Sequence, residues 1–302
     1  MLNLSDYRDA IDLDEPFPVP LNDKRSTYDL LMTALNGLRD RHYTGGSMQM
    51  HLSTDDGLMR WLQAELAMRD PAPIDPIVSR AINTLLYREM GKHGRVEGQN
   101  LRRVSELLPS IDYSFASNTI LYRGDIRQVV VDAVVNPALP ELIGCKVPLH
   151  GCLDSVIHAQ AGPWLDNDLA TIMDIQGTDV EEPGQAKITR GYRMPSKYLI
   201  HTVGPDVRDG QIDDNDRKVL HDCYWNALTL AQEQGDVESI VFPAISTGYN
   251  GFPVREAATI ALGAVEHWMD THNTNIELVI FAVHSDADAE TYIEVLSEWV
   301  AD

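Results

Sequence analysis

Two cysteines and a histidine lie close together near the middle of the chain and could bind a metal ion. Cys145, His150 and Cys152 fall within a span of eight residues. Zinc prefers thiolate and imidazole ligands, and a catalytic zinc ion has three protein ligands and an open fourth position. Because many such clusters are only packed side chains, the spacing alone leaves metal binding and packing both open. The third cysteine, Cys223, follows an apolar helical pattern and is expected in the core.

Asp154 follows the second of these cysteines by two residues and could take part in chemistry at the same place. A carboxylate there could orient or deprotonate a water molecule. It could equally cap the helix expected over residues 155–160, on which His158 is expected to be structural. Zinc deaminases also use one His and two Cys ligands, but they need H-x-E and a distant P-C-x-x-C. The sequence contains neither motif, so that class is excluded.

The elements that must position these residues change in character along the chain. Residues 1–115 read as helical and irregular, whereas from about residue 118 β-branched runs alternate with amphipathic helices. This alternation predicts a three-layer α/β/α domain with a mixed central sheet over residues 116–302, preceded by a mainly helical N-terminal extension over 1–115. The expected strands cover residues 119–123, 129–135, 198–203, 239–244 and 277–283. The expected helices cover residues 26–40, 56–69, 76–87, 217–233, 255–270 and 288–300.

The segments that follow the strands are the places to look for a ligand, because the crevice of an α/β sheet lies beyond the carboxyl ends of its strands. Residues 246–252 (STGYNGF) lie between an expected strand and an expected helix. Their small side chains could expose backbone N–H groups and a helix N-terminus to a phosphate. Such turns are also common as plain tight connections. The segment is neither a P-loop nor a G-x-G-x-x-G fingerprint.

Composition and charge limit the classes of function. The chain is 44% hydrophobic and carries a formal charge of −22. This charge argues against a nucleic-acid partner, because phosphate contacts need clustered Lys and Arg. No apolar run is long enough to cross a bilayer, and the acidic first residues lack the order of a secretory signal. We therefore expect a cytoplasmic protein with no membrane partner and no disulfide framework.

Several of these segments, taken in order, resemble a macrodomain, the module that binds ADP-ribose. The matching segments are residues 121–126 (LYRGDI), 131–136 (VDAVVN), 184–189 (GQAKIT), 201–205 (HTVGP) and 243–248 (PAISTG). Residues 144–154 (GCKVPLHGCLD) are similar to the corresponding segment of the zinc-dependent macrodomains, a microbial subgroup of protein ADP-ribosylhydrolases. Members of that subgroup also carry a helical N-terminal extension, which residues 1–115 match in general character.

The resemblance implies a zinc-dependent hydrolase that binds ADP-ribose and removes mono-ADP-ribose from modified proteins. Zn²⁺ is the implied cofactor, with Cys145, His150 and Cys152 as its ligands. Asn136 would lie near the distal ribose and would act in catalysis together with Asp154. A sirtuin-type ADP-ribosyltransferase and a lipoylated carrier protein are implied as partners.

The resemblance also assigns residues to the nucleotide. Asp125 would accept a hydrogen bond from the adenine amine, although a turn or helix-cap role is open to the same carboxylate. Ile126 would lie alongside the adenine, and His284 would stack on it or remain a surface histidine at a strand end. The residues expected to wrap the diphosphate are Ser246, Thr247, Gly248, Tyr249, Asn250, Gly251 and Phe252.

One position departs from the family pattern. Macrodomains usually have two asparagines three residues apart after the second strand, and the later one contacts the distal ribose. Here the first is Asn136, but the later position is Leu139. This departure favours an alternative function, a reader that binds ADP-ribose without turnover. Deacetylation of O-acetyl-ADP-ribose is a second alternative.

Overall fold

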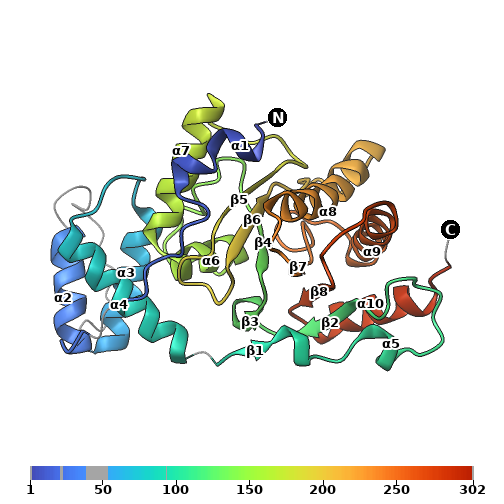
Figure 1. The fold of residues 1–302 in the computed structure, drawn as a ribbon, viewed down its shortest axis with the longest axis horizontal. Coiled ribbons are helices and arrows are strands. Elements are labelled where there is room, and N and C mark those ends of the chain that lie inside the picture. Colours follow the sequence, from blue (N-terminus) through green and yellow to red (C-terminus); the bar gives the residue numbers. More distant parts are fainter. Residues whose placement is uncertain (1, 21–22, 39–53, 93, 301–302) are drawn as a thin grey trace.

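A six-stranded sheet forms the centre of the molecule (Figure 1). The computed structural model describes residues 2–20, 23–38, 54–92 and 94–300. The strands lie in the order β2-β8-β7-β4-β6-β5, and only β5 is antiparallel to its neighbour. Their bounds are β2 Thr119–Arg123, β4 Ala133–Pro137, β5 Ala186–Arg190, β6 Tyr198–Thr202, β7 Ser239–Pro243 and β8 Leu278–Val283.

Helices cover both faces of this sheet, so the expected three-layer α/β/α arrangement with a mixed sheet is confirmed (Figure 1). On one face α6 lies against β4 and α7 against β5. On the other face α8 lies against β5 and β6, and α9 packs between α8 and α10. The bounds are α6 Leu153–Ala161, α7 Pro163–Gln176, α8 Asp214–Gln234, α9 Val254–Thr271 and α10 Asp286–Ser297. No helix in the described parts of the chain is long and apolar enough to span a membrane.

The prediction of one strand over residues 129–135 is wrong in one respect, because the structure has two strands there. The segment divides into β3 (Val129–Val130), which pairs with β1 (Val96–Glu97), and β4 of the main sheet. Asp132 causes the break: its carboxylate accepts hydrogen bonds from the backbone N–H groups of Glu238 (3.0 Å) and Ser239 (2.9 Å). The backbone at Asp132 is therefore tied to the start of β7.

Strand β5, helix α7 and the short strand β1 were not among the expected elements. Strand β5 was missed because Lys187 interrupts its apolar character, yet this lysine is buried and paired with Glu181. Helix α7 begins at Pro163, which a helix tolerates in its first turn. The helix expected over residues 26–40 is α2 (Thr27–Leu38), and residues 39 and 40 lie outside the described residues.

Buried apolar side chains form two clusters. The smaller one joins α2, α3 (Asp55–Met68) and α4 (Pro76–Lys92), which together we call the helical unit. The larger one is the core around the sheet, and it also takes in apolar residues from other N-terminal segments. These are Leu4 and Tyr7 of α1 (Leu4–Tyr7), Ile11 and Leu13, Val104 of α5 (Val104–Leu107), and Tyr113. The division of the chain near residue 115 stays a prediction.

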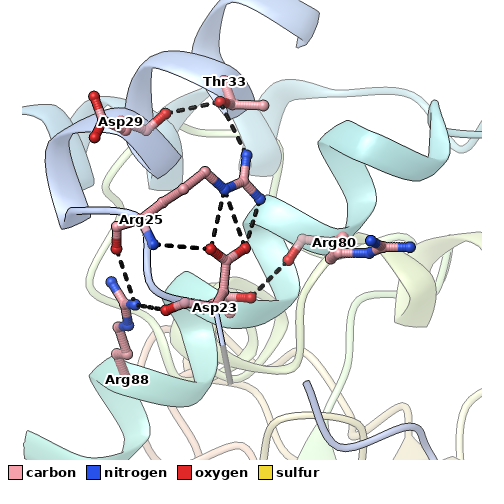
Figure 2. A network of polar contacts seen from close by, with 7 residues as sticks. Asp23, Arg25, Asp29, Thr33, Arg80 and Arg88 are labelled. Atoms are coloured by element: carbon pink, nitrogen blue, oxygen red, sulfur yellow. Dashed lines mark hydrogen bonds and ion pairs between the residues drawn. The ribbon is translucent and has the colours of Figure 1, made fainter. Parts of the chain in front are cut away.

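A polar network fixes the segment that leads into the helical unit (Figure 2). Arg88 of α4 donates hydrogen bonds to the backbone carbonyls of Asp23 (2.8 Å) and Arg25 (3.2 Å). The Arg25 guanidinium binds the Asp23 carboxylate at 2.6 Å and lowers the pKa of that carboxyl to about 2. The segment before α2 is therefore held against α4.

The helical unit lies against the sheet domain through α6 and α7 (Figure 1). The Trp164 indole N–H donates to Ser79 Oγ (3.1 Å), and the Ala72 N–H donates to the Asn167 side-chain oxygen (2.8 Å). Helix α6 is the element that begins beside the Cys and His cluster. The helical unit therefore supports the part of the fold that carries the candidate chemistry.

Candidate functional site

The predicted nucleotide-binding residues lie in a row along one edge of the sheet, at the carboxyl ends of four parallel strands. Asp125 follows β2, His284 follows β8, Ser246 lies shortly after β7 and Asn136 is near the end of β4. These strands are consecutive neighbours in the sheet. With about 4.8 Å between neighbouring strands, the row is roughly 14 Å long. Its order corresponds to the order of adenine, diphosphate and distal ribose in ADP-ribose.

The three predicted metal ligands converge at the end of this row, in the loop between β4 and α6. We call residues 144–152 the Cys-His loop. The ligand atoms of Cys145, His150 and Cys152 all lie within 4.8 Å of one another, and Cys145 Sγ is 3.3 Å from His150 Nδ1. Ligand atoms around one zinc ion lie about 3.8 Å apart. The donor set therefore fits zinc after a small closing movement.

Cys152 also caps the N-terminus of α6. Its sulfur accepts a hydrogen bond from the Ser155 N–H (3.4 Å). Burial raises the pKa of the Cys152 thiol to about 11. A coordinating thiol is deprotonated by its metal, and the positive end of a helix favours the thiolate. The position of Cys152 therefore suits a metal ligand better than a free thiolate.

The predicted catalytic pair is in direct contact and buried. Asn136 Nδ2 donates to Asp154 Oδ1 at 2.7 Å, and both residues are less than 5% exposed. Within the described parts of the chain, Asn136 Oδ1 and Asp154 Oδ2 have no hydrogen-bond partner. A buried polar atom without a partner is costly, by about 1–3 kcal/mol. Both free oxygens are acceptors, so they suit a ligand that donates hydrogen bonds, such as a hydroxyl group or water.

Charged groups surround Asp154 on its buried side. His158 Nε2 lies 3.3 Å from Asp154 Oδ1, and His158 Nδ1 lies 2.6 Å from Asp166 Oδ1. Burial alone would lower the pKa of His158, but the two carboxylates outweigh it and raise this pKa to about 10. Burial likewise opposes ionisation of Asp154, yet the charge of His158 brings its pKa below the ordinary value. Asp154 is therefore an ionised acceptor at neutral pH.

His201 of β6 completes the surroundings of Asn136. Its Nδ1 lies 3.2 Å from Asn136 Nδ2, and its Nε2 lies 3.1 Å from Thr189 Oγ1. Burial lowers the pKa of His201 to about 3, and the nearby charge of His158 acts in the same direction. His201 is therefore a neutral ring that orients Asn136.

Residues 246–252, which we call the Gly-rich loop, turn back on themselves between β7 and α9. Phe252 N–H donates to Ser246 O (2.9 Å), and Gly251 N–H donates to Gly248 O (3.1 Å). Ser246 has a φ of 62°, a left-handed conformation that costs a non-glycine residue about 1–3 kcal/mol and is frequent at ligand sites. A Cβ added to Gly248 would meet nothing within 4 Å, so the backbone there is open to a ligand.

The other predicted residues of this loop hold it in place. Thr247 Oγ1 donates to Ala244 O (2.9 Å). Asn250 Nδ2 donates to Pro205 O (3.2 Å), and Asn250 O accepts from the Val207 N–H (2.9 Å). Tyr249 is 72% exposed, with the guanidinium of Arg208 4.5 Å from its ring centre. The loop thus presents small groups and backbone, with one exposed aromatic ring at its rim.

The predicted adenine residues lie together at the other end of the row. Ile126 is buried and His284 is exposed, and the Gly124 N–H joins their two loops by donating to Val283 O (3.1 Å). The Asp125 carboxylate accepts from the Arg127 N–H (3.0 Å) and contacts its guanidinium (2.7 Å). The structure therefore shows the turn-cap role of Asp125, and its contact with adenine stays a prediction.

Three charged residues near Asp154 were not predicted as part of the site. Lys146 and Asp166 were not singled out from the sequence, and His158 was expected to be structural. Lys146 Nζ lies 3.3 Å from Asp166 Oδ2, which continues the contacts from His158. A signal was present for His158, because it follows Asp154 by four residues on a helix and therefore shares its face. Asp166 is on a different helix, so its approach depends on how α6 and α7 pack.

Comparison with known proteins gives the family. The family model described as "Macro domain" matches residues 135–261. A protein-ADP-ribose hydrolase of Staphylococcus aureus (strain MRSA252) is 40% identical over 180 residues, which cover 60% of this chain and 66% of that protein. The mouse ADP-ribose glycohydrolase MACROD2 is 39% identical over 203 residues, which cover 67% of this chain and 40% of that protein. The chain therefore spans less than two thirds of the length of these relatives.

Solved structures agree with this result. The Oceanobacillus iheyensis macrodomain with ADP is 34% identical, with a TM-score of 0.52, and the match covers 58% of this chain and 87% of that one. The Trypanosoma brucei macrodomain in complex with ADP-ribose is 27% identical, with a TM-score of 0.58, and covers 77% of this chain and 94% of that one. The fold, the family model and the identity over most of a solved macrodomain lead to one conclusion: this chain belongs to the macrodomain family.

Proposed function

We propose that this protein binds ADP-ribose along the row of strand ends and removes it from modified proteins in a zinc-dependent hydrolysis. Relatives at about 40% identity are named as hydrolases that act on protein-linked ADP-ribose or as ADP-ribose glycohydrolases. The observation that carries the proposal is the meeting of Cys145, His150 and Cys152 beside the buried pair of Asn136 and Asp154. Metal ligands and free buried acceptors then lie at the end of the row that the distal ribose would occupy.

Different residues of this chain would have different roles in the reaction. Asn136 and Asp154 each offer a free oxygen, which would accept hydrogen bonds from a ribose hydroxyl and from the attacking water. When bound by the three ligands, zinc supplies Lewis-acid polarisation or a water of lowered pKa. In the reaction the water oxygen bonds to the anomeric carbon of the distal ribose, the bond from that carbon to the protein side chain breaks, and the side chain takes up a proton. Asp154, ionised and fixed, orients the water rather than serving as a strong base.

The Gly-rich loop would bind the diphosphate without cationic side chains. Its glycines and small residues leave backbone N–H groups accessible, and such groups bind phosphate when they lie near a helix N-terminus. Residues 246–252 contain no Lys or Arg. This explains how a chain with a formal charge of −22 could bind an anionic nucleotide.

A reader of ADP-ribose is the second candidate, and Leu139 favours it. This leucine is 40% exposed and replaces a polar side chain near the expected reaction centre. The O-acetyl-ADP-ribose substrate, the sirtuin-type and lipoylated partners and the cytoplasmic location stay predictions from the sequence.

Release of ADP-ribose from a modified protein distinguishes hydrolase from reader. Wild type and Cys145→Ala are incubated with an ADP-ribosylated protein, and free ADP-ribose is measured. We expect release by the wild type and little by the variant, because the variant lacks one metal ligand. Tight binding of ADP-ribose by a wild type that releases none would support the reader instead.

A further inference from the structure

A line of alternating charges connects the helical unit to Asp154. It begins at Arg69, the residue directly after α3. The backbone carbonyl of Arg69 accepts a hydrogen bond from Lys146 Nζ (2.9 Å). The same ammonium lies 3.3 Å from Asp166, and Asp166 lies 2.6 Å from His158. His158 in turn faces Asp154 at 3.3 Å. The end of α3 therefore meets the Cys-His loop, α6 and α7 in one series of contacts, although Arg69 lies 77 residues before Lys146 in the chain.

We propose that Lys146, Asp166 and His158 are positioning residues, through which the helical unit fixes the direction of the Asp154 carboxylate. The proposal rests on the proposed function, because the direction of the Asp154 carboxylate has a catalytic purpose only if Asp154 acts in the proposed hydrolysis. It makes the helical unit a part of the site rather than an attached module.

The two Asp154 carboxylate oxygens have different contacts, and the proposal explains this difference. Oδ1 accepts from Asn136 and faces His158, while Oδ2 has no partner among the described residues. A carboxylate rotates readily about its last torsion, which has broad, roughly two-fold minima. The hydrogen bond from Asn136 and the attraction to the His158 ring, whose Nε2 lies 3.3 Å away without hydrogen-bond geometry, both act on Oδ1 and hold the other oxygen in a single direction. The free oxygen is thus kept available for a donor on a ligand.

His158 needs partners on both sides to do this. It is 7% exposed, and an imidazole ring that contacts two carboxylates must present a nitrogen to each. Lys146 balances Asp166, so the four groups form two cation–anion pairs rather than an unbalanced buried charge. Without Lys146, Asp166 would be left to attract His158 alone, and the ring could move away from Asp154.

The Cys-His loop packs closely on this ring. Gly144 has a φ of 75°, and a Cβ at this position would lie 2.8 Å from His158 Nδ1. A small pocket beside it is lined by Leu66 and Ala67 of α3 together with Cys145 and His158. The metal ligands, the His158 ring and the end of α3 are therefore neighbours in one packed region.

The test compares Lys146→Met, which removes the ammonium, with Lys146→Arg, which keeps a cation that can donate to Arg69 and Asp166. Ser79→Ala is the matched control, because it removes another hydrogen bond between the helical unit and the sheet domain, the one from Trp164. Four quantities are measured for each protein: kcat for ADP-ribose release, KM, ADP-ribose affinity by calorimetry, and zinc content.

We expect Lys146→Met to lower kcat about tenfold, since misplaced catalytic groups lose rate, and to leave KM, nucleotide affinity and zinc content unchanged. Lys146→Arg should restore most of kcat, and Ser79→Ala should behave as wild type. A wild-type kcat in Lys146→Met would overturn the proposal. So would a loss of zinc along with kcat, or an equal loss in Ser79→Ala, because either would mean a general structural effect.

A readout that does not need turnover separates this proposal from the proposed function. In protein labelled with ¹⁵N-histidine, the ring signals of His158 are assigned by their disappearance in His158→Gln. We expect two protected ring N–H signals in wild type and a changed Nδ1–H signal in Lys146→Met. An unchanged signal would overturn the line of contacts even in an active enzyme. A wild type that shows these signals but releases no ADP-ribose would overturn the proposed function, and with it the catalytic purpose of the contacts.

Discussion

Two neighbouring parts of the strand-end row, at β4 and at β7, are built on different principles. At the β4 end, chemistry depends on side chains: Asn136, Asp154 and the three residues of the metal cluster converge, and buried charges hold them. After β7, the Gly-rich loop offers small groups and backbone, without Lys or Arg. The difference teaches how an acidic chain can bind an anion at one place and concentrate reactive groups at another. It also implies that the two parts can be disabled separately.

Removing a metal ligand should have the largest effect, and only on the chemistry at β4. Cys145→Ala leaves two of three ligands, so we expect loss of bound zinc and a fall in ADP-ribose release of about a hundredfold or more. Nucleotide affinity should change by less than about threefold, since the diphosphate binds elsewhere. Metal analysis, a release assay and calorimetry measure the three quantities. A variant that keeps both zinc and turnover would contradict the metal assignment.

Metal binding at β4 and nucleotide binding should also respond differently to pH. Burial raises the pKa of the Cys152 thiol to about 11, so this thiol is protonated near neutrality and must lose its proton to bind zinc. Because Cys145 must also bind as a thiolate, zinc affinity should fall by at least tenfold for each pH unit as the pH is lowered from about 8 to about 6. Competition with a chelator measures it. ADP-ribose affinity of the zinc-free Cys145→Ala protein should stay nearly constant, and a parallel fall in that affinity would show that metal binding and nucleotide binding are not separate.

Loss of the expected adenine contact should weaken binding without touching the metal. Asp125→Ala should reduce ADP-ribose affinity by roughly 1–3 kcal/mol through loss of a charge-assisted hydrogen bond. Calorimetry measures the affinity, and zinc content should equal that of wild type. Arg127→Ala is the control, because it removes the competing partner of the same carboxylate and should not weaken binding. An Asp125→Ala protein of undiminished affinity would mean that adenine lies elsewhere.

The smallest effect is expected at Gly248. A Cβ there meets no protein atom within 4 Å, so Gly248→Ala should leave the fold intact. The added methyl group would hinder the approach of a diphosphate to the backbone, with a loss of affinity on the order of 1 kcal/mol. Gly91→Ala is a matched control, since a Cβ at Gly91 of α4 also meets nothing within 4 Å. Equal affinities for wild type and Gly248→Ala would show that the ligand does not approach this residue.

Much of the fold could be predicted because alternating strand and helix patterns are local. Strands with continuous apolar runs, such as β7 and β8, were evident in the sequence. Strand β5 was not, because the charge of Lys187 is neutralised by Glu181, and that pairing depends on the folded chain. In the same way, the break at Asp132 depends on β7, more than a hundred residues later.

The site could be predicted where its residues are close in sequence and not where they meet through packing. Cys145, His150 and Cys152 lie within one loop, so their spacing in the sequence is enough to indicate a metal cluster. The contacts of Asp166 with His158 and Lys146 depend on how α6, α7 and α3 pack. No short motif carries that information.

A crystal structure of the protein with zinc and ADP-ribose, with zinc located by its anomalous scattering, tests the central claim most directly. The account predicts one zinc ion bound by Cys145, His150 and Cys152, the distal ribose beside it, the diphosphate on residues 246–252 and the adenine near Asp125. A nucleotide in the reverse direction, or bound away from the strand ends with those three side chains apart, would contradict it.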